Sequence, residues 1–411
     1  PVQVTDKPYQ WLKGKDLREN DLSNKKDLLL TCNFDTKTKW PTKDKMPTGF
    51  NPAKVIDFGK KQGLGLKKLY KKGYNGQGVN IAVIDGKLKK NHKEIKNNLV
   101  YYEEVQNLAD YKINFHGTAV ASIAIGKNIG VAPGANLYYF AIHDAPDSNK
   151  YQANIAEAIK RIIEFNKNHS KEEQIRLVVS ACGYSTSNIG GQKYYNAIKL
   201  AERNNILVLE PHFNVLEKSH IKHYILDANC SYPQNNNNYD NYQMGRWGQK
   251  YLNDLYILHK LANQTNNWAE FKDKLNKKIN NLKNNNHYSF VLTLIKNNYN
   301  KLEDKYNSIV ELRNYIDENI SYYLRKSLYI PSQSITTASD KGKNEYIYCG
   351  GSGISYALPY YAGVAALTLQ VNPELTNKEV VDIIDKTAVI NERGLRLIAP
   401  KRVVKEALNN K

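Results

Sequence analysis

Residues 350–367 read GGSGISYALPYYAGVAAL. A glycine-rich run ends at Ser355 and an apolar segment of small residues follows at once, which predicts a tight loop that turns directly into a buried helix. The Ser355 hydroxyl is therefore expected at a helix N-terminus, where unpaired backbone N–H groups favour developing negative charge. Taken alone, the same stretch also fits a buried helix with a capping serine.

Two other stretches suggest partners for this serine. Residues 79–86 read VNIAVIDG, which predicts a buried strand ending in the carboxylate of Asp85. Residues 115–124 read FHGTAVASIA, which predicts a small-residue helix that begins at His116. A lone aspartate there could cap a loop, and a lone histidine could cap a helix. However, the chain order Asp85, His116, Ser355 is one of the orders in which serine proteases carry their catalytic residues.

With these stretches, and with IGVAPGANLY at 129–138, the chain resembles the subtilisin-like serine protease family over roughly residues 65–215 and 330–411. The resemblance implies an α/β, subtilisin-like three-layer fold, with a mostly parallel central sheet flanked by helices. It also implies a serine endopeptidase that hydrolyses peptide bonds through an acyl-enzyme on Ser355, with His116 as general base and Asp85 orienting it. No cofactor or catalytic metal is implied. Some family members bind structural calcium, but no acidic loop here indicates a calcium site.

The resemblance also suggests residues that contact substrate. Two segments fall where the family binds an extended peptide through backbone hydrogen bonds, namely Asp147, Ser148 and Asn149, and Ala181, Cys182 and Gly183. An ordinary polar turn explains residues 147–149 equally well.

Asn214 falls at the family's oxyanion asparagine, and one such donor contributes about 3–4 kcal/mol to transition-state stabilisation in a subtilisin. Pro211, His212 and Phe213 replace small residues of the family pattern. This departure leaves open whether Asn214 keeps its place and whether Phe213 narrows the first specificity pocket. It favours an alternative function, a catalytically silent or latent subtilase relative that acts as a binding or regulatory scaffold. The retention of all three triad residues opposes that alternative.

The composition narrows the range of partners. The formal net charge is +19, from 59 Lys and Arg against 40 Asp and Glu. Because the lysines are dispersed among asparagines and no nucleic-acid motif accompanies them, we expect no nucleic-acid partner. The resemblance to the protease family implies a protein or peptide substrate. The sequence contains no run of 18 apolar residues, so it predicts no membrane span. No signal peptide is visible at Pro1, and the chain does not open with methionine, so secreted and cytoplasmic locations both stay open.

The four cysteines lack metal-binding spacing. We expect Cys182 to be a buried free thiol, and a Cys230–Cys349 disulfide stays an open alternative.

The chain divides into an N-terminal extension or arm at 1–62 and a peptidase domain at 63–411, interrupted by a helical insertion at about 235–328. Apolar residues recurring every three or four positions predict insertion helices at 251–261, 268–282, 288–302 and 309–324. The insertion is either a surface decoration or a lid or partner-binding surface. Elsewhere, the sequence predicts strands at 136–142, 175–181, 205–209 and 332–338. It predicts helices at 155–165 and 195–202. Thr376 and Glu379 predict a capping box at the start of a later helix.

Overall fold

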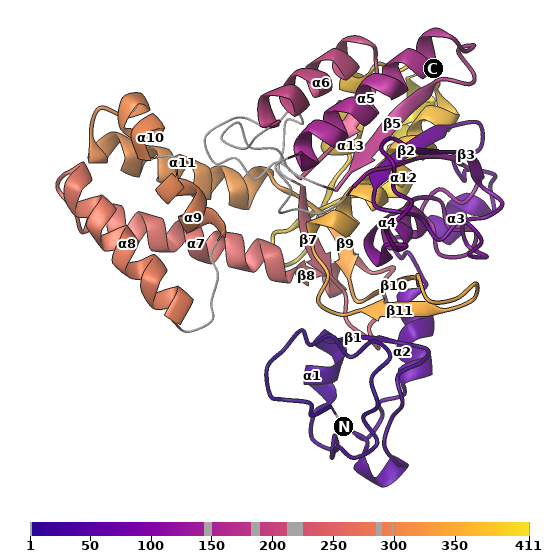
Figure 1. Cartoon of the computed structure of the whole chain (residues 1–411), viewed down its shortest axis with the longest axis horizontal. Coiled ribbons are helices and arrows are strands. Elements are labelled where there is room, and N and C mark those ends of the chain that lie inside the picture. Colours follow the sequence, from indigo (N-terminus) through magenta and orange to yellow (C-terminus); the bar gives the residue numbers. More distant parts are fainter. Residues whose placement is uncertain are drawn as a thin grey trace. The chain divides into compact units, whose positions relative to one another are not determined.

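The computed structural model describes residues 2–143, 150–181, 190–211, 225–284, 290–297 and 299–410. These residues form two compact units, drawn in Figure 1. The larger unit contains the described residues up to 211 together with 225–245 and 328–410, and the smaller contains 246–327. The N-terminal residues expected as an arm cluster with the larger unit, whereas the exact domain boundaries stay predictions.

A five-stranded parallel sheet forms the centre of the larger unit, in the order β3-β4-β2-β5-β6. Its strands are β2 (Asn80–Asp85), β3 (Leu99–Glu104), β4 (Asn136–Ala141), β5 (Ile175–Ser180) and β6 (Leu207–Leu209). Every residue of the central strand β2 is buried, as expected for a parallel strand covered on both faces. The register pairs Asp85 with Ala141 at the carboxyl ends of β2 and β4, so Asp85 lies at the edge where α/β sheets place their sites.

Helices cover both faces of this sheet. On one face, α5 (Tyr151–Lys167) and α6 (Gly191–Arg203) share a hydrophobic core with Tyr138 and Phe140 of β4. Side chains alternate along a strand, so Tyr139 points to the opposite face, where it approaches Gly117 of α4 (Phe115–Ile125). The helix α12 (Ile354–Val371) packs along α4. This helix–sheet–helix arrangement confirms the predicted α/β fold class.

Two further sheets, one of five strands and one of three, complete the larger unit. One has the order β12-β13-β9-β7-β8 and the other the order β1-β11-β10. The strand predicted at 332–338 is in fact two strands, because Ser334 has φ of +55°, which interrupts extended backbone. The strands are β1 (Asn33–Asp35), β7 (Ile225–Asn229), β8 (Gln243–Met244), β9 (Leu328–Gln333), β10 (Ile335–Ala338), β11 (Tyr346–Cys349), β12 (Val389–Ile390) and β13 (Arg396–Leu397).

The N-terminal residues are built into the larger unit. Their spaced leucines, including Leu12, Leu17 and Leu22, are buried in a cluster that also contains Tyr348 of β11. β1 pairs antiparallel with β11, so the N-terminal segment reaches the strand that leads into the serine loop. The helices in and after this segment are α1 (Lys26–Thr31), η1 (Lys43–Lys45), α2 (Pro52–Gly59) and α3 (Leu66–Tyr70).

The C-terminal part of the larger unit follows its predicted pattern. The capping box of Thr376 and Glu379 is confirmed at the start of α13 (Asn377–Lys386). The last described helix is α14 (Pro400–Asn409). Earlier in the chain, between β7 and β8, a short 3-10 helix η2 spans Tyr239–Asn241.

The smaller unit is helical. It contains α7 (Arg246–Asn263), α8 (Trp268–Asn284), α9 (Phe290–Asn297), α10 (Tyr299–Lys305) and α11 (Ile309–Lys326). Of the helix predicted at 288–302, the structure describes α9 and α10, and residues 288, 289 and 298 lie outside the described ranges. Inside the unit, the rings of Tyr251 and Tyr323 stack at 4.6 Å, and the Tyr323 hydroxyl donates to the carbonyl of Gly248. These contacts hold α7 against α11.

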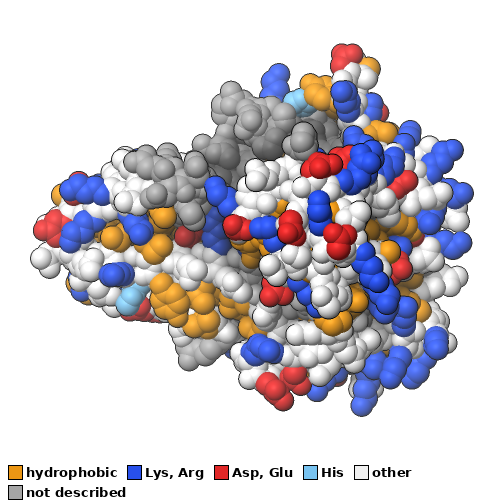
Figure 2. All heavy atoms as spheres, turned by 90° about the horizontal axis from the view of Figure 1, so that it is seen from below, with side chains coloured by type: hydrophobic (Ala, Val, Ile, Leu, Met, Phe, Trp, Pro, Cys, Tyr) orange, Lys and Arg blue, Asp and Glu red, His pale blue; other side chains and the backbone are white. Residues whose placement is uncertain are grey.

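Charged side chains are spread over the face of the molecule shown in Figure 2, with acidic groups among the lysines and arginines. Within the described ranges, no helix is long and apolar enough to cross a membrane.

Candidate active site

The structure joins two of the three predicted catalytic residues. His116 Nδ1 lies 2.7 Å from Asp85 Oδ2. Because a carboxylate only accepts hydrogen bonds, Nδ1 carries the hydrogen, and in the neutral ring Nε2 carries the lone pair. The side chain of Asp85 is 7% exposed and that of His116 is 37% exposed. The pair therefore consists of a buried carboxylate and a partly solvent-accessible imidazole.

Local hydrogen bonds hold this pair in place. Asp85 Oδ1 accepts from the backbone N–H of Gly86 at 2.8 Å. The side chain of Asn114 caps α4 by accepting from the backbone N–H of His116 at 2.5 Å. Asn114 was not among the predicted site residues, although an asparagine two positions before a helical histidine is a recognisable N-cap signal.

Gly117 allows the close approach of α4 to the sheet. A Cβ at this position would lie 2.0 Å from the Tyr139 hydroxyl and 3.0 Å from Asp85 Cβ. The Tyr139 hydroxyl cannot easily retreat, because it donates to the carbonyl of Gly86 at 2.5 Å. The absence of a side chain at 117 therefore brings the histidine within hydrogen-bond reach of the aspartate.

Ser355 lies in the first turn of α12, and the N-cap residue is Gly353, without a side-chain cap. The alternative of a capping serine is therefore wrong. Ser355 is half-buried, and the ring of the next residue, Tyr356, lies 6.1 Å from the His116 ring. Burial raises the pKa of the Tyr356 phenol well above its ordinary value, so Tyr356 stays neutral and acts as a packing group beside the histidine.

The loop before Ser355 is held by segments from two other parts of the chain. Gly350 N–H donates to Cys32 O, and Gly351 N–H donates to Asn33 Oδ1, each at 3.2 Å. Gln333 Nε2 donates to the carbonyl of Ser352 at 2.8 Å, and the Ser352 hydroxyl donates to the carbonyl of Ser332. The contribution of the N-terminal residues to this loop was not predicted, because no local sequence pattern signals such a long-range contact.

The same N-terminal segment also reaches the start of α4. The rings of Trp11 and Phe115 meet edge to face at 5.1 Å, and Lys13 Nζ lies 4.8 Å from the centre of the Phe115 ring. Phe115 directly precedes His116, so these contacts support the backbone that carries the base.

Most of the predicted substrate-binding residues lie outside the described ranges, namely Asp147, Ser148, Asn149, Cys182, Gly183, Phe213 and the oxyanion candidate Asn214. Of that set the structure describes Ala181, a half-buried residue directly after β5. These assignments stay predictions.

Cys32, Cys230 and Cys349 are free and buried, so the alternative of a Cys230–Cys349 disulfide is wrong. Burial raises the pKa of the Cys349 thiol to about 12, which keeps it from acting as a nucleophile near neutral pH. No group of three or more His, Cys, Asp or Glu in the described part of the chain could hold a metal ion.

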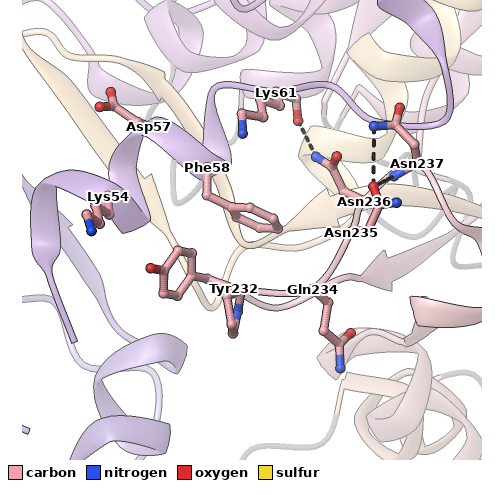
Figure 3. A pocket seen from close by; sticks show the side chains of 10 residues that line it. Lys54, Asp57, Phe58, Lys61, Tyr232, Gln234, Asn235, Asn236 and Asn237 are labelled. Carbon is pink, nitrogen blue, oxygen red and sulfur yellow. Dashed lines mark hydrogen bonds between the residues drawn. The ribbon is translucent and has the colours of Figure 1, made fainter. Parts of the chain in front are cut away.

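Figure 3 shows a cavity of about 470 Å³ between α2 and residues 232–237. Two of the asparagines that line it form hydrogen bonds with the protein backbone. Asn236 Nδ2 donates to the carbonyl of Lys61 at 2.9 Å, and Asn237 Oδ1 accepts from the backbone N–H of Gly65 at 2.9 Å. None of the predicted site residues lines this cavity.

Comparisons with known proteins agree with the sequence pattern. The sequence model of the subtilase family matches residues 76–210, which include Asp85 and His116 and end before Ser355. The resemblance to this family is thus confirmed over that segment. No curated protein matches the chain.

Among solved structures, the chain is similar to the prenylagaramide maturation protease PagA. The two share 15% sequence identity over 84% of this chain and 98% of the other, with a TM-score of 0.48.

Proposed function

We propose that the chain, whose residues 76–210 match the sequence model of the subtilase family, is a subtilisin-like serine endopeptidase that hydrolyses peptide bonds through an acyl-enzyme on Ser355. The observation that carries the proposal is the 2.7 Å hydrogen bond between Asp85 and His116. A buried carboxylate bound to Nδ1 of a half-exposed imidazole is the arrangement that general-base catalysis requires.

In the proposed reaction, His116 Nε2 takes the proton of the Ser355 hydroxyl as its oxygen attacks the peptide carbonyl. The imidazolium so formed is stabilised by Asp85 and then protonates the leaving amine. Water repeats the same steps on the acyl-enzyme, with His116 again as base, and releases the carboxylic acid. The backbone N–H of Ser355 and the amide of Asn214 are the proposed oxyanion donors.

The serine loop supports this assignment. Ser355 lies in the first turn of α12, where helix N–H groups favour negative charge. The loop before it is anchored by hydrogen bonds at Gly350, Gly351 and Ser352. A fixed loop lowers the entropic cost of bringing the hydroxyl to the substrate.

A second candidate is a silent or latent subtilase relative that binds a partner through the cleft or the helical unit. The sequence at Pro211, His212 and Phe213 favours it, because these residues replace small ones beside the proposed oxyanion donor. A scaffold has no chemical reason to keep the Asp85–His116 hydrogen bond, so the endopeptidase is the better supported function.

A fluorophosphonate probe tests the proposal directly. The unmodified protein should be labelled on the peptide that contains Ser355, and Ser355→Ala should lose both the label and about 10³-fold or more of its peptide hydrolysis. Ser170→Ala, at an exposed serine, is the control and should behave like the unmodified protein. Hydrolysis that survives in Ser355→Ala would refute the proposal, and a folded protein without label or hydrolysis would favour the scaffold.

A further inference from the structure

A cavity of about 570 Å³ is formed in part by segments that adjoin Asp85 and His116 along the chain. One wall consists of Lys87, Leu88 and Lys90, which follow Asp85, and another consists of residues 111–113, which precede His116. These two walls are joined by a hydrogen bond of 2.8 Å from Asn114 N–H to the carbonyl of Lys87. The cavity therefore adjoins the backbone segments that carry both the carboxylate and the base.

The charge of this cavity is unbalanced. It is lined by four lysines and two acids, namely Lys87, Lys90, Lys112, Lys341, Glu104 and Asp340. Both acids are already paired, since Lys87 Nζ lies 3.4 Å from Glu104 Oε1 and Lys341 Nζ lies 3.0 Å from Asp340 Oδ2. Asp340 also forms an ion pair with Lys13, from outside the cavity.

Two of the lysines form no ion pair with another described residue. Lys90 and Lys112 are exposed, and neither forms an ion pair with any acid that the structure describes. Lys90 Nζ is held over the ring of Tyr102 at 4.2 Å. The cavity thus presents positive charge without a counter-ion from its own walls.

The same cavity has an apolar edge. Tyr111 is 44% exposed and Ile113 is 39% exposed. The ring of Tyr111 is supported from one side by His143, edge to face at 4.3 Å. An apolar edge next to lysines without an ion pair to a described acid suits a peptide residue with an aliphatic stem and an anionic head, such as glutamate.

We propose that this lysine cavity binds an acidic side chain of the peptide substrate, within a few residues of the bond that is cleaved. This inference rests on the proposed endopeptidase function and adds a substrate class to it. The net charge of +19 would attract acidic peptides over longer distances, and Lys90 and Lys112 would select one position of the bound peptide.

Matched peptide substrates test this selection. Peptides that differ by Glu, Gln or Lys at one position at a time should show one position where Glu raises kcat/KM by about 3- to 10-fold over Gln, and this preference should decline with added salt. The double variant K90E/K112E should abolish the preference for Glu and favour Lys. The double variant K160E/K96E is the control for total charge, because both lysines are exposed and lie outside the cavity. If the control loses the preference equally, or if no position prefers Glu, the inference is wrong.

A binding measurement separates this inference from the catalytic proposal. Fluorescent peptides that carry Glu or Gln at one position at a time, each with an amidated C-terminus, are titrated into Ser355→Ala. If the unmodified protein hydrolyses nothing, tighter binding of the Glu peptide that K90E/K112E removes would still support the cavity. Should only peptides with a free C-terminus bind, the anion recognised would be a terminal carboxylate and the side-chain assignment would fail.

Discussion

Replacing Gly117 by alanine should show how much the close packing of α4 against the sheet contributes to stability and to hydrolysis, because the proposed catalytic side chains stay unchanged. The new Cβ would lie 2.0 Å from the Tyr139 hydroxyl and 3.1 Å from Asp85 Oδ1. Tyr139 is fully buried, and its ring is stacked on Tyr102 at 5.9 Å, so the clash must be relieved by moving α4. Overpacking of this kind costs about 1–3 kcal/mol, and we expect a value near the upper limit.

The compensating change is Tyr139→Phe, which removes the oxygen that the new Cβ would meet. Alone it should cost about 1 kcal/mol, because the hydrogen bond to the carbonyl of Gly86 is lost. The double variant should therefore be less destabilised than the sum of the single variants, by about 1–2 kcal/mol. Its hydrolysis should stay reduced, because the contacts of the new Cβ with Asp85 remain.

Urea denaturation of the four proteins measures these free energies and needs no activity. Phosphonate labelling rates, measured in parallel, report on the geometry of the site. If Gly117→Ala changed the free energy of unfolding by less than about 0.5 kcal/mol, or if the two changes were additive, the close-packing argument would be refuted.

Two further predictions concern the serine loop and the dependence of stability on pH. Asn33→Ala removes the acceptor for the Gly351 N–H and should slow kcat about fivefold at unchanged KM, from a lost hydrogen bond of about 1 kcal/mol. Arg18→Ala, in an exposed ion pair, is the control, and equal kcat values for the two variants would contradict a positioning role. Burial lowers the pKa of His92 below its ordinary value of 6.5. As the pH falls, His92 is therefore protonated more readily in the unfolded chain than in the folded protein. Stability should consequently fall as the pH drops from about 7 to 5. His92→Gln should flatten that fall in urea midpoints, and an unchanged slope would show that other groups cause it.

The elements that carry the candidate site could be recognised from local sequence. The run VNIAVIDG became β2 with Asp85 as its last residue. His116 is the second residue of α4, and Ser355 is the second residue of α12. These predictions hold because the pattern of apolar and small residues along a short segment decides whether it is a strand or a helix.

Other features escaped prediction because they depend on neighbours in space. Ser334, with its positive φ, divides a strand that the sequence pattern suggested was continuous. By contrast, the start of α2 at Asn51 and Pro52 has a local sequence signal, an N-cap asparagine followed by proline, and could have been predicted.

The sequence was sufficient to identify the types of residue at the site and their order along the chain. Tertiary structure decided that the Asp85 and His116 side chains meet at 2.7 Å, that Asn33 supports the loop at Gly351, and that lysines from separate segments line one cavity. The physical reason is that strand and helix formation depends mainly on nearby residues, whereas hydrogen-bond distances and charge balance depend on how distant segments pack.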